Sequence, residues 1–167
     1  MLLQKLIFRS PNIPCRAICT SVLQDGIKNI TMESPKTRNS LSLDMLKRLE
    51  SEIQSDRSNP DLRCIVIGGN GPAFSAGHNL KEMTYKEGRV YHEEIFNKCT
   101  DVMKAIAEHP VPIIAKVDGV AAAAGCQLVA MCDIAVATVK SKFLVPGSSV
   151  GLFCSTPGIP LARNVPR

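Results

Sequence analysis

Two short stretches of small residues stand where main-chain groups could do chemistry. They are "AFSAGHNLKEM" (73–83) and "VDGVAAAAGCQLVAMCDIAVA" (117–137), and each follows an apolar run. Alanine and glycine let a ligand approach backbone N–H groups closely. The segment 124–131 also has a helical pattern, and the first N–H groups of a helix are unpaired and partly positive. Two such turns facing each other would offer paired donors to a polarised carbonyl oxygen. The alternative is that small residues only permit tight helix–strand packing.

The cysteines and histidines do not form a metal site. The chain has seven cysteines and three histidines, with no C-x-x-C pair and no ligand spacing between them. Most of the cysteines lie in apolar or helical patterns, where a free thiol behaves as a small buried apolar group. We therefore expect structural thiols in a reducing compartment, without metal or a disulfide framework.

Charge and aromatic content argue against nucleic acid as a partner. The net charge is +5, but Lys5, Arg9 and Arg16 all precede the first acidic residue, Asp25. The remainder is close to balanced, and aromatic residues make up 4% of the chain with no Trp. No apolar run approaches the roughly 18 residues needed to span a membrane.

Residues 1–24 read as a targeting segment. The segment is basic and acid-free, contains Ser and Thr, and begins with a short amphipathic pattern of leucines and isoleucine. That composition is typical of a mitochondrial transit peptide, which predicts location in the mitochondrial matrix and a mature chain beginning near residues 20–25. The alternative is a frayed N-terminal arm.

From residue 25 on, strand and helix patterns alternate within one expected domain, 25–167. Strands are expected at 26–32, 64–69, 111–119 and 133–138. Helices are expected after a Ser42 cap, over 91–108 and over 124–131. Continuous apolar runs such as "CIVIGG" are typical of buried parallel strands. The order predicts an α/β fold with crossovers between parallel strands.

Four stretches, in the right order, resemble motifs of the crotonase (enoyl-CoA hydratase/isomerase) superfamily. They are "SPKTRNSLS", "AFSAGHNLKEM", "VDGVAAAAGCQLVAMCDIAVA" and "KFLVPGSSVGL". The resemblance implies the ClpP/crotonase fold of repeated ββα units, with the family's C-terminal helical region missing, so that the domain is incomplete at its C-terminus. It also implies assembly into homo-trimers or hexamers, which is doubtful for the shorter chain.

The resemblance further implies a coenzyme A thioester as ligand, with no other cofactor. In the family, two main-chain N–H groups hold the thioester oxygen, and the matching positions here are His78 and Ala124. Lys36 and Arg38 match positions near the CoA nucleotide, although they could equally be a solvated basic loop. The acyl-CoA-binding positions carried over are Lys36, Arg38, Ala76, His78, Asn79, Leu80, Lys81, Ala124 and Gly125.

The chain departs from the family at the acid–base residues. The two glutamate positions of the hydratases hold Gln127 and Gly147 here. An amide neither gives nor takes a proton near neutral pH, and glycine has no side chain. Three other titratable groups lie nearby: Glu82 and Asp133, expected to be scaffold, and His78, expected to be a cleft wall.

These departures leave three hypotheses within mitochondrial fatty acid metabolism. The first is an acyl-CoA enzyme with altered acid–base groups, in which ordinary hydration is severely impaired. The second is a non-catalytic acyl-CoA binder or regulator of lipid metabolism. The third is an inactive truncated isoform without a ligand site. Whether the chain is an enzyme stays open at this point.

Overall fold

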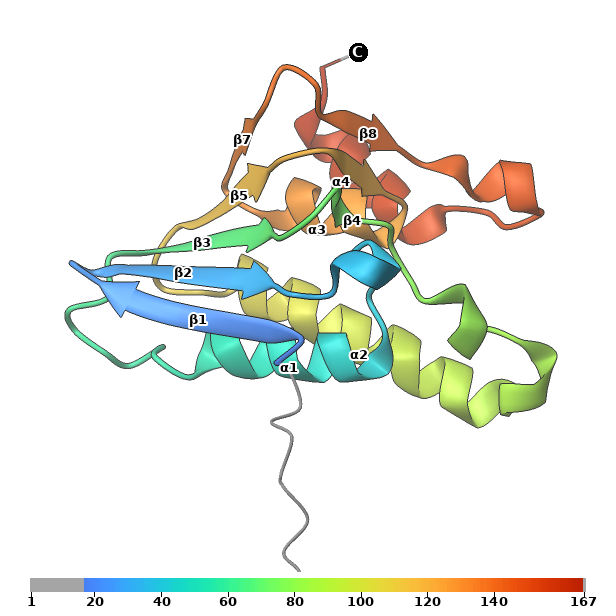
Figure 1. Ribbon diagram of the computed structural model, residues 1–167, viewed down its shortest axis with the longest axis horizontal. Helices are drawn as coiled ribbons and strands as arrows, with labels where there is room; N and C mark the ends of the chain where they lie inside the picture. The colour runs from blue at the N-terminus through green and yellow to red at the C-terminus, as the bar shows by residue number, and fades with distance from the viewer. Residues whose placement is uncertain (1–16, 167) are drawn as a thin grey trace, which may run out of the picture.

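The computed structural model describes residues 17–166. Most of the expected transit peptide, residues 1–16, lies outside this range. Two sheets and the helices that follow their strands build the described part (Figure 1).

The first sheet is parallel except for one edge hairpin. Its strands are, in order across the sheet, β1 (Cys19–Gln24), β2 (Ile27–Met32), β3 (Cys64–Gly69), β5 (Ile113–Val117) and β7 (Ile134–Ala137). β1 pairs antiparallel with β2 through a two-residue turn in which Asp25 and Gly26 both have positive φ, 52° and 79°. A two-residue loop with positive φ at both positions gives the tight hairpin that Asp-Gly favours.

A second, smaller sheet stands beside the first. Its strands are β4 (Ala73–Ser75), β6 (Val120–Ala122) and β8 (Lys142–Leu144), and all of them run parallel. Each strand of this sheet follows a strand of the first sheet along the chain, and a helix comes next. The repeating unit is therefore strand, short strand, helix, which confirms the expected crotonase-like ββα architecture.

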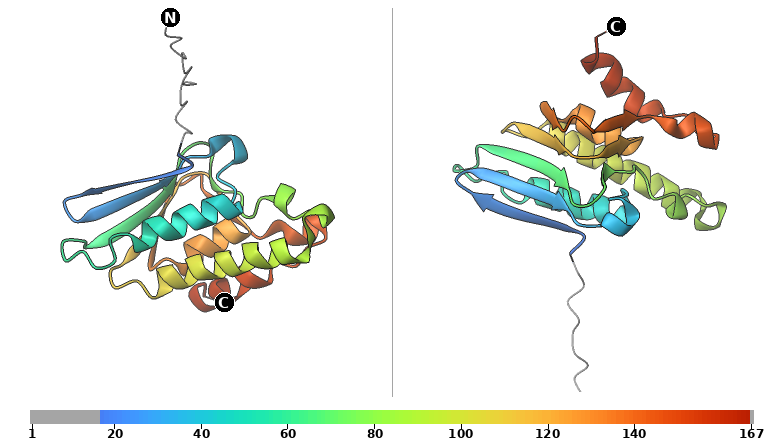
Figure 2. Two further views of the ribbon diagram at one scale, coloured as in Figure 1. Left: turned by 90° about the horizontal axis from the view of Figure 1, so that it is seen from below. Right: turned by 45° about the horizontal axis from the view of Figure 1, so that its top comes forward.

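The helices cover the first sheet and close each unit. They are α1 (Leu43–Gln54), α2 (Gly88–Ala107), α3 (Ala124–Met131) and α4 (Ser155–Asn164). α1 and α2 run side by side over one face of the sheet (Figures 1 and 2), and α4 packs on α3. Ser42 caps α1 as expected, because its Oγ accepts the Met45 N–H at 3.2 Å.

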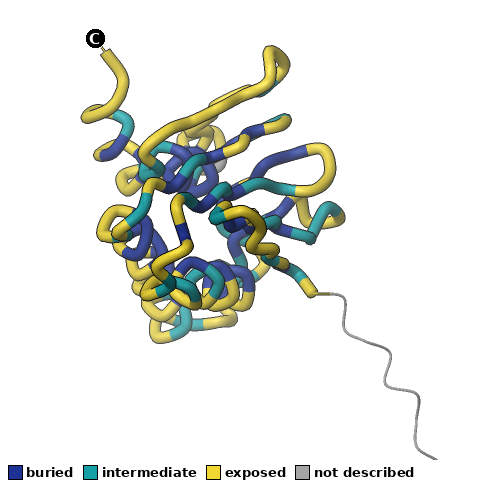
Figure 3. The backbone as a smooth tube through the Cα atoms, turned by 90° about the vertical axis from the view of Figure 1, so that its left-hand side faces the viewer, coloured by how far each residue is buried: buried dark blue, intermediate teal, exposed yellow. Residues whose placement is uncertain are grey.

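The core lies between the first sheet and helices α1 to α3. Leu46, Leu49, Ile65, Ile67 and Val102 are among its fully buried members, and their positions follow the helical and strand periods expected from the sequence. β7 and β8 differ, since every one of their residues is exposed (Figure 3).

The expected strands and helices are all present, and the structure adds elements that were not expected. Cys19–Gln24 forms β1, inside the segment assigned to the transit peptide, and Cys19 is fully buried in the core. The end of that segment therefore overlaps the folded sheet. The short strands of the second sheet were likewise read as loops or as the ends of longer strands.

Candidate functional site

The two small-residue turns meet at one edge of the second sheet. β4 and β6 are parallel neighbours, with Ala73 opposite Val120 and Ser75 opposite Ala121, so the turns that follow them emerge together. Gly77 has a φ of 82°, and a Cβ built there would lie 3.1 Å from the Ala124 nitrogen. Only glycine tolerates both that conformation and that approach.

Tight packing also holds at the second turn. A Cβ on Gly125 would lie 2.6 Å from the Ser75 carbonyl oxygen. The packing interpretation is therefore confirmed, and the same residues bring the two turns face to face, while their use as paired donors to a ligand stays a prediction.

Two main-chain N–H groups at this meeting point are free. Neighbouring amides are engaged: Ala76 N–H donates to the Arg38 carbonyl at 2.9 Å, and Ala123 N–H donates to the Leu144 carbonyl at 2.8 Å. By contrast, no group within residues 17–166 accepts a hydrogen bond from the N–H of His78 or of Ala124. Ala124 is the first residue of α3, so its N–H also carries the partial positive charge of a helix start.

The backbone just before the second donor is in an unusual conformation. Ala123 has a φ of 49° and a ψ of −119°, a region that suits glycine better than alanine. Ala124 itself is a buried helical residue. The unusual backbone conformation thus lies one residue before the Ala124 N–H.

A cavity of about 330 Å³ opens beside the two turns. Of the residues expected at the site, it brings together Ala76, His78, Leu80, Ala124 and Gly147. Among the described residues that line it there is no Asp, Glu, Lys or Arg, and His78 contributes the imidazole in its wall. Asn79, Lys81, Gly125 and Gln127 are not among its walls.

The His78 imidazole forms part of the cavity wall. Its ring meets that of Phe96 edge-on, with centroids 5.3 Å apart. Both ring nitrogens are buried and have no hydrogen-bond partner among the described residues. Burial lowers the pKa of His78 below its usual value of 6.5, so the ring is neutral at physiological pH.

Neither of the two former glutamate positions offers an acid–base group. A Cβ on Gly147 would lie 2.5 Å from the Cys154 Sγ and 2.7 Å from the Leu152 carbonyl oxygen, so this backbone leaves no room for a side chain. Gly147 N–H instead donates to the Cys154 Sγ at 3.2 Å. Gln127 is 8% exposed in α3, and its Oε1 has no partner among the described residues.

The basic loop lies directly against the first turn. Lys36 belongs to the short 3-10 helix η1 (Pro35–Thr37) and Arg38 follows it, and both side chains are exposed. Two backbone hydrogen bonds tie the loop to the turn. The Ala76 N–H donates to the Arg38 carbonyl, and the Leu41 N–H donates to the Gly77 carbonyl at 2.7 Å. The backbone that carries Lys36 and Arg38 is therefore held beside the first turn, although neither residue is among the described residues that line the cavity.

Asn39 is the residue of this region that sequence reasoning missed. Its side chain is fully buried, its Nδ2 donates to the carbonyls of Asn70 and Ala73 at 2.9 Å, and its Oδ1 accepts the Ser34 N–H at 2.9 Å. Asn39 therefore fixes the basic loop to the strand that leads into the first turn. Its place in the "SPKTRNSLS" motif was the only signal in the sequence.

Glu82 and Asp133 are scaffold residues, as expected. The Glu82 Oε2 accepts the Leu43 N–H at 3.0 Å at the start of α1. The Asp133 Oδ2 accepts the Ile113 N–H at 2.8 Å at the start of β5. Among the other carried-over positions, Asn79 caps a short 3-10 helix, η2 (Leu80–Glu82), by accepting the Lys81 N–H.

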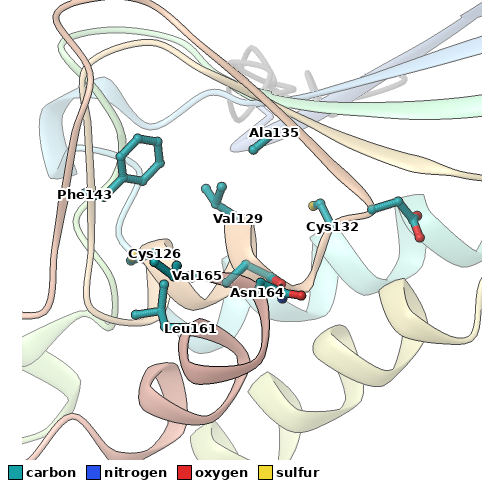
Figure 4. Close-up of a pocket in the computed structure, with 10 residues that line it drawn as sticks. Cys126, Val129, Cys132, Ala135, Phe143, Leu161, Asn164 and Val165 are labelled. Carbon is teal, nitrogen blue, oxygen red and sulfur yellow. Dashed lines mark hydrogen bonds between the residues drawn. The ribbon is translucent and has the colours of Figure 1, made fainter. Parts of the chain in front are cut away.

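A second cavity, of about 480 Å³, lies between α3, β8 and α4 (Figure 4). Its walls are mostly apolar, and Asn164 on its rim donates to the Ala130 carbonyl at 2.7 Å. The described cysteines, including Cys126 and Cys132 in this cavity, are free thiols. Within residues 17–166, no group of three or more His, Cys, Asp and Glu is placed to hold a metal ion.

The paired amides, the cavity and the ββα repeat can now be compared with known proteins. The sequence pattern described as Enoyl-CoA hydratase/isomerase matches residues 23–167. The chain belongs to the enoyl-CoA hydratase/isomerase family. Human mitochondrial enoyl-CoA hydratase domain-containing protein 3 is a member that is 61% identical over 143 residues, which is 86% of this chain and 47% of that protein. The zebrafish (Danio rerio) protein of the same name is 51% identical over 144 residues, 86% of this chain and 50% of its own length.

Solved structures of family members share the fold. The crystal structure of human enoyl-CoA hydratase domain-containing protein 3 superposes on this chain with a TM-score of 0.88 and 57% sequence identity. The superposition covers 90% of this chain and 60% of the human one. The crystal structure of an enoyl-CoA hydratase from Mycobacterium smegmatis superposes with a TM-score of 0.86 and 47% sequence identity, and the match covers 90% of this chain and 59% of the hydratase chain. The chain spans about half the length of the curated relatives that it matches. No helix in the described part is long and apolar enough to cross a membrane.

Proposed function

We propose that this chain binds an acyl-CoA thioester, with the thioester oxygen held between the N–H groups of His78 and Ala124. The observation that carries the proposal is that these two free amides emerge from neighbouring parallel strands beside one cavity. Preorganised backbone donors stabilise an oxygen that gains negative charge. Lys36 and Arg38, on the loop tied to the first turn, are suited to the phosphates of the CoA nucleotide.

The bound thioester is not hydrated at an ordinary rate in this proposal. Hydration needs a group that activates water and moves a proton, and such groups contribute about 10²–10⁴-fold. Gln127 and Gly147 provide none, and no carboxylate lines the cavity. In this proposal the chain acts as an acyl-CoA binder or regulator in fatty acid metabolism. The competing hypothesis is an acyl-CoA enzyme with altered acid–base groups.

The proposed location is the mitochondrial matrix. The acid-free basic composition of the N-terminal segment supports it. The names of the human and zebrafish relatives also include the word mitochondrial.

Calorimetric titration with butyryl-CoA tests the binding. Gly77→Ala places a methyl group 2.8 Å from the Ala122 carbonyl and 3.1 Å from the Ala124 nitrogen, so it should push the two donors apart and abolish binding. Gly88→Ala is the matched control, because Gly88 also has a positive φ but no atom within 4 Å of the added methyl. Equal binding by both variants, or no binding by the unmodified chain, would refute the proposal.

A further inference from the structure

A cysteine thiol lies in the wall of the cavity that the two free amides border. Cys154 follows the short 3-10 helix η4 (Pro146–Val150) along the chain and is the N-cap residue of α4. It lines the same cavity as His78 and Ala124, the residues that carry the free N–H groups. Its side chain is half-buried and the thiol is free, so the sulfur is open to a molecule held in the cavity.

The sulfur takes the place of a side chain that the hydratases of the family have. By the sequence resemblance, Gly147 stands at their second glutamate position, and a Cβ on Gly147 would lie 2.5 Å from the Cys154 Sγ. Two heavy atoms cannot approach so closely, so the thiol excludes the first side-chain atom of such a glutamate. At this point of the cavity the chain therefore presents a sulfur nucleophile instead of a carboxylate.

The partners of the sulfur suit its attacking form. The nucleophile of a cysteine is its thiolate, which is strongly reactive toward carbonyl carbons. The Gly147 N–H donates to the Cys154 Sγ at 3.2 Å, and the sulfur also stands at the start of α4. An N–H donor and a helix start are both partners that a negatively charged atom prefers.

The opposite part of the wall carries an independent sign of a missing polar group. Both ring nitrogens of His78 are buried at the cavity and have no hydrogen-bond partner among the described residues. Buried polar atoms are nearly always paired in folded proteins, so these two nitrogens indicate a polar group that has still to enter. The cavity thus combines free donors, unpaired nitrogens and a nucleophile.

We propose that Cys154 takes the acyl group from the bound thioester, so that the chain becomes S-acylated and coenzyme A is released. The inference rests on the proposed acyl-CoA binding and adds a chemical step to it. The thiol loses its proton to solvent, and the sulfur forms a bond to the carbonyl carbon while the N–H groups of His78 and Ala124 hold the oxygen. The bond from that carbon to the CoA sulfur then breaks, and the CoA thiolate takes up a proton.

The balance of this step explains why the product should accumulate. One thioester replaces another, so the transfer needs no oxidant, no reductant and no further reactant. Hydrolysis of the acylated cysteine would need a group that activates water. The described residues of the wall include no Asp or Glu to do so. We therefore expect a stable acyl-enzyme rather than repeated turnover.

Mass spectrometry of the full 167-residue chain after incubation with butyryl-CoA tests the proposal. The intact chain should gain the mass of a single butyryl group, and an equal amount of free CoA should appear in chromatography. Peptide sequencing should place the group on Cys154, and neutral hydroxylamine should remove it, as it does a thioester. An unchanged mass, or equal labelling of the other cysteines, would overturn the proposal without any substitution being needed.

A pair of cysteine variants checks that the labelled residue carries the transfer. Cys154→Ser should lose the adduct, because a serine hydroxyl is a weak nucleophile without an adjacent base. Cys64→Ser is the matched control, since Cys64 is also a half-buried free thiol but does not line the cavity. The control should be acylated at the rate of the unmodified chain. Equal acylation of both variants would show that Cys154 is not the acceptor.

A ketone analogue of butyryl-CoA, with carbon in place of the thioester sulfur, separates binding from transfer. The analogue keeps the carbonyl oxygen but has no leaving sulfur, so it should bind in calorimetry and release no CoA. If neither this analogue nor butyryl-CoA binds, the proposed function fails, and this inference fails with it. If both bind but butyryl-CoA leaves the mass of the chain unchanged, the proposed function stands and the transfer to Cys154 is wrong.

The contribution of the two amides to the transfer is tested through the first turn. Gly77→Ala, which displaces the donors, should slow the acylation of Cys154 by at least about 100-fold. Gly88→Ala, where the added methyl meets no atom within 4 Å, should leave the rate unchanged. Acylation at the same rate in both variants would show that the thiol reacts without the amides, which contradicts the proposed step.

Discussion

At the scale of single residues, the contact between Gly147 and Cys154 determines whether position 147 can hold a carboxylate side chain. The thiol occupies the space that a side chain at position 147 would need, and the Leu152 carbonyl closes the other side. The loss of a glutamate here is thus built into the surrounding packing, and replacing the glycine alone cannot reverse it.

We expect the unmodified chain to show no hydration of crotonyl-CoA above background, measured as loss of the enoyl thioester absorbance. Gly147→Glu should fail to restore activity and should lower stability by about 1–3 kcal/mol through overpacking. Gly158→Glu is its control, because a Cβ there meets no atom within 4 Å. Robust hydration by the unmodified chain would show that another group supplies the acid–base chemistry and that the assignment of Gln127 and Gly147 is wrong.

His78 predicts a dependence of stability on pH. Burial lowers its pKa in the folded chain below 6.5, so below about pH 6.5 the unfolded chain binds a proton that the folded chain does not. Its contribution to stability is present above that pH and is lost as the pH falls toward the folded pKa. Each such group changes the unfolding free energy by up to ~1.4 kcal/mol per pH unit.

Urea unfolding between pH 5 and pH 8 measures this effect. The stability of His78→Gln should fall less steeply on acidification than that of the unmodified chain, since an amide does not titrate. Parallel curves for the two proteins would mean that His78 is not the group responsible.

At the scale of elements, β1 sets a limit on where an N-terminal segment can be removed. β1 pairs with β2 along its whole length and contributes the buried Cys19. We therefore expect the mature chain to begin before Cys19, rather than near residue 25. N-terminal sequencing of protein recovered from mitochondria tests this, and a chain beginning at residue 25 should melt at a lower temperature than one beginning at residue 17. A native start near residue 25 would contradict the prediction.

β2 and α1 are joined by a buried lysine. Lys28 is 1% exposed, and its Nζ donates to the Glu52 carbonyl, the Ser55 Oγ and the Asp56 carboxylate within 2.7 Å. Lys28→Met leaves these acceptors without a donor and should destabilise the fold by about 1–3 kcal/mol. Lys47→Met removes an exposed ion pair with Glu94 and should cost under about 1 kcal/mol. Similar unfolding free energies for both variants would show that the buried cluster does not stabilise the fold.

The elements that the sequence predicted are the ones with a long, regular pattern. Apolar runs identified β3 and β5, and the placing of Ile30 and Met32 on one face identified β2. The period of α1 identified its buried face, and Ser42 identified its cap. β1 was missed because its basic surroundings resembled a leader, although Asp25–Gly26 is a strong hairpin signal. β4 and β6 were missed because a strand of three residues is too short to show a readable alternation.

The residues of the candidate site also fall into those that the sequence predicted and those that it did not. The two proposed donors, His78 and Ala124, come from the resemblance, because the motif fixes their positions along the chain. Nothing in the sequence showed that Ala123 carries the strain, that Cys154 fills the space beside Gly147, or that Asn39 is buried. Each of these depends on contacts between segments far apart in the chain, which local patterns do not encode.

At the scale of the whole molecule, the outer side of the last repeat is uncovered. Ile134, Val136, Phe143 and Leu144 are all exposed on the strands that form open edges of the two sheets, and the exposed Val145 follows directly. Exposed apolar strand edges promote association. We expect the 167-residue chain to self-associate as its concentration rises, measured by sedimentation velocity.

Charged substitutions on that side should reduce the association. Val136→Lys and Phe143→Lys place like charges on the two open strands, whereas Val90→Lys, on the exposed face of α2, is the control. A monodisperse monomer at all concentrations, with cooperative unfolding, would show that the exposed strands need no cover.

The order of the strands has a consequence for how the chain folds during synthesis. After the first hairpin, each strand added to the larger sheet pairs with a strand that precedes it in the chain: β3 with β2, β5 with β3 and β7 with β5. In the smaller sheet, β6 pairs with the earlier β4 and β8 with the earlier β6, so among the described strands that follow the hairpin only β4 waits for a partner that the ribosome has yet to make. Chains are synthesised from the N-terminus at about 5–20 residues per second, far more slowly than a short segment docks on an existing sheet. Each repeat can therefore dock on a finished template as it emerges, and translation itself sets the order of assembly.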